Sequence, residues 1–197
     1  MLYELEKAER FIFMEYFIID HGKMWNTILD ILERKAEQGV EVRLLYDGMG
    51  SQFLLPNHYD KYLETKGIKC RIFNEFRPFL STAQNNRDHR KILVIDGTTA
   101  FNGGVNLADE YINEKERFGH WKDTAVMLKG EAVWSFTVMF IQMWEWKTKQ
   151  LSDYEKYRPA NISQFNRISE GYVLPYGDSP TDNEPVGCLL YTSPSPR

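Results

Sequence analysis

The chain has 197 residues, of which 43% are hydrophobic and 26% are charged. This length and composition predict one globular domain with a sizeable core and argue against a disordered chain or a second full domain. The formal net charge of -4 excludes a general electrostatic attraction for nucleic acid, so local cations must hold any anionic substrate.

The chain contains two cysteines, Cys70 and Cys188, which are too few for a disulfide framework and favour a reducing compartment. Residues 1–10 are acidic and polar, whereas a signal peptide has a basic start followed by an apolar stretch. No apolar run reaches the roughly 20 residues that span a bilayer as a helix. These features predict an ordinary globular chain.

Taken in chain order, the apolar spacing predicts strands that alternate with helices. We expect strands at residues 11–19, 40–46, 68–73, 89–95 and 124–128, a return strand that ends at 101, and helices at 25–36, 58–65 and 131–147. The first five elements alternate strand and helix, which is typical of parallel strands in an α/β layer. Asp96-Gly97 lies between two apolar runs and predicts a hairpin. The expected fold is α/β, a mixed and mostly parallel sheet flanked by helices.

The character of the chain changes after Lys149. We expect residues 1–149 to form the catalytic domain, and 150–187, polar and containing four prolines, to be a linker and the start of a truncated second half. Residues 188–197, CLLYTSPSPR, have no periodicity and resemble translated read-through of a sequencing adapter. The natural chain is then expected to be cut near Gly187; the alternative is a genuine disordered tail.

The residues that carry chemistry start at His89, where HRKILVID has the pattern H-x-K-x-x-x-x-D. Residues i and i+2 of a strand share a face, so His89 and Lys91 should point the same way, a nucleophile or base beside a cation. Further along, paired glycines at Gly103 and Gly104 allow close approach of backbone to a ligand, and Asn106 offers an amide donor. We expect Lys91, Gly103, Gly104 and Asn106 to bind a phosphate group. The alternative is a solvated strand end with a chance His and Lys.

Two weaker signals lie earlier in the chain. Asp47-Gly48-Met49-Gly50-Ser51 follows a strand, which is where α/β folds place ligands, but a plain turn is the safer interpretation. Glu15 interrupts an apolar strand and should pair with a cation of the site or with Arg43.

The segment RDHRKILVIDGTTAFNGGVN resembles the HKD motif of the phospholipase D superfamily. The flanking segments MEYFIIDHGKMWNTILDILERKAEQGVEVRLLYDGMGS, GGVNLADEY and WKDTAVMLKG resemble the first catalytic half of bacterial cardiolipin synthases. The resemblance extends from about Ala8 to Trp146. It implies that His89 attacks the phosphodiester phosphorus and forms a phosphohistidine, while Lys91 and Asn106 hold the non-bridging oxygens. It implies no metal and no other cofactor.

Two aspartates complete the expected site. Asp96 belongs to the motif, but its place in the hairpin turn predicts a structural role and not proton transfer. Asp123 precedes a strand. The resemblance implies that a carboxylate at this position holds the other ring nitrogen of the nucleophile and so fixes its tautomer and orientation. The alternative for Asp123 is a surface residue at the start of a strand.

The family builds one active site from two HKD motifs, and the second histidine serves as general acid and then base. No second motif is found here, because His21-Gly22-Lys23 is followed by Ile28 where the aspartate is required. We therefore expect a second half in a longer chain, or a homodimer, and we expect this fragment alone to be inactive. The resemblance also implies a location at the bacterial cell membrane, with membrane-spanning helices missing from this fragment and the catalytic domain in the cytoplasm.

The expected reaction is formation of cardiolipin from two phosphatidylglycerols. A hydrolytic phospholipase D, a phosphatidylserine synthase and a non-catalytic lipid-binding half-domain remain as alternatives, since the acceptor alcohol is not visible in the sequence. A nuclease is disfavoured because the chain is acidic and lacks a basic stripe.

Overall fold

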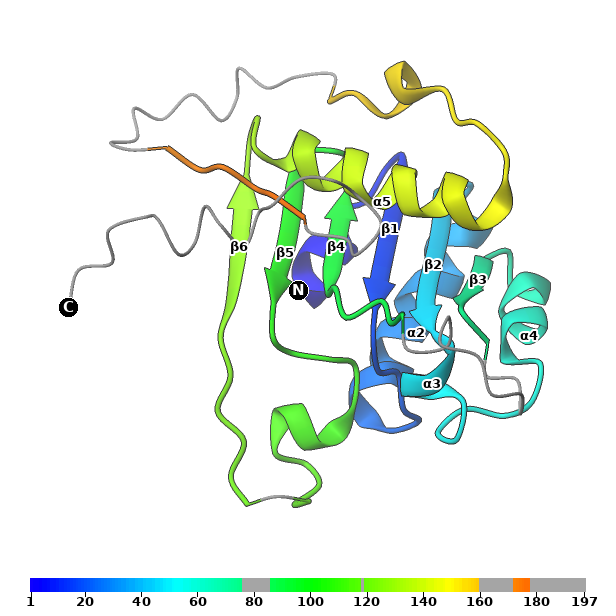
Figure 1. Cartoon of the computed structure of the whole chain (residues 1–197), viewed down its shortest axis with the longest axis vertical. Coiled ribbons are helices and arrows are strands. Elements are labelled where there is room, and N and C mark those ends of the chain that lie inside the picture. Colours follow the sequence, from blue (N-terminus) through cyan, green and yellow to red (C-terminus); the bar gives the residue numbers. More distant parts are fainter. Residues whose placement is uncertain (76–85, 118, 160–171, 178–197) are drawn as a thin grey trace.

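The computed structural model describes residues 1–75, 86–117, 119–159 and 172–177 (Figure 1). The proposed adapter-derived tail at 188–197 and most of the expected linker lie outside these residues. Within them, the strands are β1 (Phe11–Tyr16), β2 (Glu41–Asp47), β3 (Lys69–Phe73), β4 (Ile92–Ile95), β5 (Thr99–Gly103) and β6 (Ala125–Lys129). The helices are α1 (Leu2–Leu5), α2 (Lys23–Glu37), α3 (Gly48–Ser51), α4 (Tyr59–Thr65) and α5 (Val133–Thr148), with 3₁₀ turns η2 (Asp109–Ile112) and η3 (Tyr154–Tyr157).

The six strands form one mixed sheet in the order β3-β2-β1-β4-β5-β6. The expected α/β sheet flanked by helices is confirmed, but the expectation that most pairings are parallel is wrong. β1 pairs in parallel with β2, and β2 with β3. The β1–β4, β4–β5 and β5–β6 pairs are all antiparallel. The tight turn at Asp96-Gly97 accounts for the β4–β5 pair, and the β1–β4 pair is antiparallel because β4 enters the sheet in the direction opposite to β1.

Each face of the sheet has its own hydrophobic core, because successive strand side chains point to opposite faces. Ile12 and Met14 of β1 join the core beneath α2, whereas Phe11 and Phe13 join the core beneath α5. Figure 1 shows α5 crossing one face of the sheet, with α2 on the other. The ring of Phe13 stacks on Phe140 of α5 at 4.6 Å between centroids. The aromatic residues of this helix thus serve largely as core packing.

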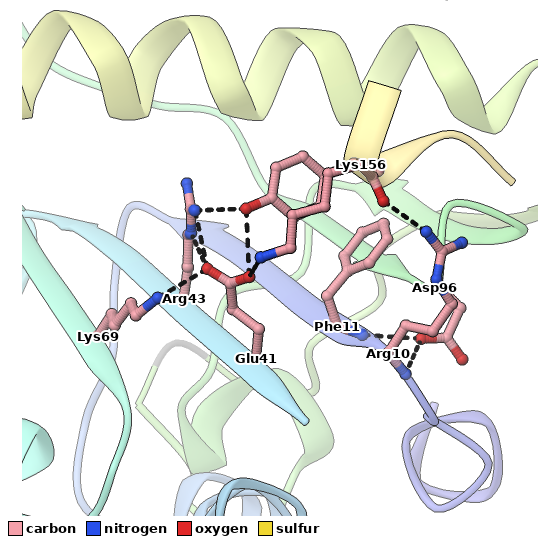
Figure 2. A network of polar contacts seen from close by, with 8 residues as sticks. Arg10, Phe11, Glu41, Arg43, Lys69, Asp96 and Lys156 are labelled. Carbon is pink, nitrogen blue, oxygen red and sulfur yellow. Dashed lines mark hydrogen bonds and ion pairs between the residues drawn. The ribbon is translucent and has the colours of Figure 1, made fainter. Parts of the chain in front are cut away.

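The packed part of the chain continues past the boundary expected at Lys149. Tyr157 of η3 is buried in the core beneath α5 and packs edge-on against Phe11 at 5.2 Å. The Arg10 guanidinium holds this return by donating to the backbone carbonyls of Lys156 and Arg158, and Figure 2 shows the contact with Lys156. Residues 154–158 are therefore part of the domain and not a free linker.

Candidate active site

His89 and Lys91 lie side by side in the extended segment that leads into β4. The Lys91 Nζ is 3.1 Å from His89 Nδ1 and donates a hydrogen bond to the His89 carbonyl at 2.6 Å. The His89 side chain is exposed, whereas Lys91 is buried with 5% exposure. The structure thus brings together the pair that the motif predicts, even though β4 begins at Ile92 and not at His89.

The surroundings of this pair lower the pKa of both groups. Partial burial, and then the positive charge of Lys91, lower the pKa of His89, although the charges of Asp88 and Asp47 oppose that shift. Burial lowers the pKa of Lys91 to about 8, while Asp88 and Asp123 act in the opposite direction. At neutral pH the imidazole is therefore largely neutral and the lysine still largely charged.

The contact also fixes which nitrogen of His89 bears the proton. A charged lysine can only donate, so Nδ1 must accept and the neutral ring carries its hydrogen on Nε2. Attack through Nε2 thus requires Lys91 to leave Nδ1, and a bound phosphate oxygen would compete for the ammonium.

Asp123 lies against Gly104 and not on the imidazole. Its carboxylate accepts from Trp121 Nε1 at 3.1 Å, and its charge acts on Lys91. Among the hydrogen bonds of the described residues, none joins Asp123 to His89. The orientation role expected for Asp123 therefore has no contact to support it in this arrangement, whereas its charge acts on Lys91.

The paired glycines make room for the chain's own backbone. A Cβ on Gly103 would lie 2.4 Å from the Thr124 carbonyl oxygen, and one on Gly104 would lie 2.2 Å from Asp123 Oδ1. Gly104 also donates its N–H to the Thr124 carbonyl at 3.0 Å. The close approach predicted at this pair is thus present, and the group that approaches in this structure is the segment directly before β6.

Asn106 is buried and bridges two segments. Its Oδ1 accepts the Ile18 N–H at 3.0 Å and its Nδ2 donates to the Tyr111 hydroxyl at 2.8 Å. Since an amide nitrogen carries two donors, one N–H remains for a phosphate oxygen. Its first task in this structure is to hold the loop after β5 against the end of β1.

Asp96 lies at the opposite end of β4 from His89. Its carboxylate accepts the backbone N–H groups of Glu9, Arg10 and Phe11 at 2.8–2.9 Å, and Figure 2 shows its contact with Phe11. Asp96 and Gly97 both have positive φ, 54° and 70°, as a tight hairpin turn requires. The structural role expected for Asp96 agrees with these contacts, and grouping it with the reacting residues does not.

A buried cluster next to His89 was only partly visible in the sequence. Arg90 Nε lies 2.6 Å from Glu15 Oε1 and 3.3 Å from Asp88 Oδ1, and both carboxyl groups are buried. Burial, followed by the charge of Asp88, raises the pKa of Glu15 well above its usual value. Glu15 was expected to pair either with a cation of the site or with Arg43. It pairs with Arg90, the residue next to His89, whereas Arg43 pairs with Glu41.

Asp47, which the sequence analysis interpreted as part of a plain turn, also contacts the segment that carries His89. It is fully buried, and its Oδ2 accepts the backbone N–H of Asp88, the residue before His89, at 3.0 Å. The available signal was a carboxylate at the end of a buried strand.

In the part of the chain that the structure describes, no group of three His, Cys, Asp or Glu side chains is arranged to hold a metal ion. Within the same residues, no helix has the length and apolar content needed to cross a bilayer.

The fold resembles that of solved phospholipase D proteins. The crystal structure of a phospholipase D family member, Nuc from Salmonella typhimurium, superposes with a TM-score of 0.53 at 18% identity and covers 78% of this chain and 87% of that one. Phosphatidylserine synthase from Haemophilus influenzae gives a TM-score of 0.50 at 16% identity, over 72% of this chain and 33% of that one. At these identities the likeness defines the fold alone: a phospholipase D-like α/β domain.

Comparison of the amino-acid sequence with known proteins identifies the family to which the chain belongs. The family model described as "Cardiolipin synthase, PLD-like domain" matches residues 1–144. An uncharacterized protein of Streptococcus mutans is 58% identical over 189 residues, which are 95% of this chain and 40% of that protein. A cardiolipin synthase of Geobacillus kaustophilus is 44% identical over 146 residues, 74% of this chain and 29% of the relative. The chain belongs to the family of cardiolipin synthase phospholipase D-like domains, and it spans less than half the length of these relatives.

Proposed function

We propose that this domain supplies the nucleophilic half of a bacterial phosphatidyltransferase that converts two phosphatidylglycerols into cardiolipin and glycerol. The observation that carries the proposal is the exposed His89 ring in contact with the buried Lys91 ammonium, 3.1 Å from Nδ1. The family match and the Geobacillus relative support the choice of a phospholipid substrate.

In the first step, Lys91 leaves His89 Nδ1 for a phosphate oxygen, and the ring proton moves from Nε2 to Nδ1 by exchange with solvent. His89 Nε2 then attacks the phosphorus of phosphatidylglycerol, and the bond from phosphorus to the glycerol oxygen breaks. Lys91 stabilises the charge that develops on the non-bridging oxygens, and the second N–H of Asn106 could share that task. The product is a phosphatidyl group on His89, and the departing glycerol oxygen takes a proton from a general acid. A hydroxyl of a second phosphatidylglycerol then attacks the same phosphorus, loses its proton to the resulting base, and releases His89.

The general acid is proposed to come from outside the described site. His89 is the described histidine in contact with Lys91, whereas the ring of His21 packs against Tyr59. A second H-x-K half, either in a longer polypeptide or in a second copy of this chain, would supply the acid. The proposed working location is the surface of the bacterial cell membrane, where phosphatidylglycerol is presented.

A substrate with an activated leaving group tests the nucleophile without the missing acid. Phosphatidyl-p-nitrophenol releases p-nitrophenolate, which leaves without being protonated. We expect a burst of one p-nitrophenolate per chain and an acid-labile phosphatidyl group on residue 89, detected by mass spectrometry. His89→Gln should abolish both, and His120→Gln, an exposed histidine outside the contact, should keep both.

The acceptor is then read from the product. Because the base of the second step is proposed to lie in a second half, this measurement uses the chain together with that half. Phosphatidylglycerol added after the burst should then give cardiolipin in preference to the phosphatidic acid formed with water or the phosphatidylserine formed with serine. Turnover to the latter products would favour a hydrolase or a phosphatidylserine synthase. Binding of phosphatidylglycerol vesicles without any burst or adduct would overturn the proposal and favour a lipid-binding module.

A further inference from the structure

The segment Asp47–Ser51 reaches the nucleophile through the backbone. Asp47 ends β2 and caps α3, with its Oδ1 accepting the N–H groups of Met49 at 2.8 Å and Gly50 at 3.0 Å. Its Oδ2 accepts the Asp88 N–H at 3.0 Å. One fully buried carboxylate therefore ties the end of β2 to the residue directly before His89.

The same segment reaches the nucleophile a second time, through the ring of Phe17. The Ser51 Oγ donates to the Phe17 carbonyl at 3.2 Å and accepts the Ile19 N–H at 3.0 Å. A Cβ on Gly50 would lie 2.2 Å from the Phe17 carbonyl oxygen, so the two backbones are in close contact. The Phe17 ring lies 4.7 Å from the His89 ring, centroid to centroid.

We infer that Asp47–Ser51 is a positioning platform for His89, which fixes the imidazole through the Asp88 backbone on one side and through Phe17 on the other. The inference deepens the proposed function, because it rests on His89 as the nucleophile. An ordinary cap of a short helical turn would need only the Asp47 Oδ1 contacts. The use of Oδ2 for a residue 41 positions away, and the second route through Ser51, go beyond capping.

The test variant is Asp47→Asn, which preserves the shape of the side chain. An amide has one acceptor oxygen and one donor nitrogen, so either the turn or the Asp88 N–H loses its acceptor. The matched control is Asp109→Asn. Asp109 also accepts two backbone N–H groups from a distant segment, those of Lys23 at 3.0 Å and Met24 at 2.8 Å, but at the start of α2.

Two readouts separate positioning from mere stability. In Asp47→Asn the p-nitrophenolate burst should keep its amplitude per folded chain but slow by about 10- to 100-fold, because a small displacement of the attacking atom is costly. The NMR titration of His89 should move to lower pH, since the Asp47 charge raises the pKa of His89, and the nuclear Overhauser contact with Phe17 should weaken. Asp109→Asn should show neither change, although both variants lose stability.

A second variant keeps the inference testable if Asp47→Asn does not fold. Ser51→Ala removes only the hydroxyl, and it should weaken the contact between His89 and Phe17 with a smaller loss of burst rate. Wild-type titration and wild-type ring contacts in the folded variants would overturn the platform. A missing burst in the wild-type chain would instead refute the proposed function, and the NMR comparison would still decide the platform.

Discussion

The amino group of Lys91 lies 3.1 Å from Nδ1 of His89, so the protonation state of each group affects the other. Burial of Lys91 has a cost, because it lowers the pKa of the amine to about 8. Partial burial of His89, and then the positive charge of Lys91, lower the pKa of the imidazole. The pair is therefore set for a neutral imidazole beside a charged lysine within one window of pH.

The burst rate should follow a bell-shaped pH profile set by this pair. As pH rises through the lowered pKa of His89, the ring loses its proton and the rate increases. As pH rises further through about 8, Lys91 loses its charge and the rate falls. Lys91→Arg should remove the alkaline fall, because a guanidinium stays charged. Burst rates are measured with phosphatidyl-p-nitrophenol, and the background rate of the His89→Gln variant is subtracted at each pH. An unchanged fall in rate at alkaline pH in Lys91→Arg would refute the assignment of that fall to Lys91.

Gly104 should be required because of Asp123 and not because of a ligand. Gly104→Ala places a Cβ 2.2 Å from Asp123 Oδ1, and this overpacking should cost about 1–3 kcal/mol of unfolding free energy. In an Asp123→Ala background the same change should cost much less, because the clashing carboxylate is gone. Urea unfolding of the four proteins measures the coupling.

Gly103→Ala is the matched control for that cycle. Its Cβ would meet the Thr124 carbonyl oxygen at 2.4 Å, which Asp123→Ala leaves in place. The cost of Gly103→Ala should therefore be the same in both backgrounds. Equal costs for Gly104→Ala in the two backgrounds would show that Asp123 is not the reason for the glycine.

Glu41 should stabilise the domain at neutral pH and lose that effect in acid. Burial would raise the pKa of its carboxyl, but hydrogen bonds from Lys156, Lys69 and Arg43 outweigh burial and hold the pKa well below its usual value (Figure 2). Its contribution is thus fully present above the unfolded pKa of about 4.3 and disappears as pH falls through the folded value.

Glu41→Gln should lower the unfolding free energy at pH 7 by about 1–2 kcal/mol, a modest figure because water screens the two lysines. The difference from wild type should shrink below about pH 4, where the unfolded carboxyl is protonated. Urea unfolding at a series of pH values measures it, with Glu37→Gln, an exposed glutamate of α2, as control. A difference that stays constant with pH would contradict the charge-based account.

Local patterns in the sequence predicted most of the elements and the pair formed by His89 and Lys91. Helical spacing predicted α2 and α5, the Asp96-Gly97 turn predicted the β4–β5 hairpin, and two-residue spacing placed Lys91 beside His89. These features depend on residues close together in the chain, so periodicity and turn chemistry are sufficient to predict them.

Tertiary structure alone decided what surrounds that pair. The antiparallel entry of β4 beside β1, the Asp47 carboxylate on the Asp88 backbone, the contact of Asp123 with Gly104 and the return of Tyr157 to the core each join residues far apart in sequence. Such contacts leave no local period, because they arise from the way the elements pack. The sequence thus determined which groups we propose to react, and packing determined what holds them in place.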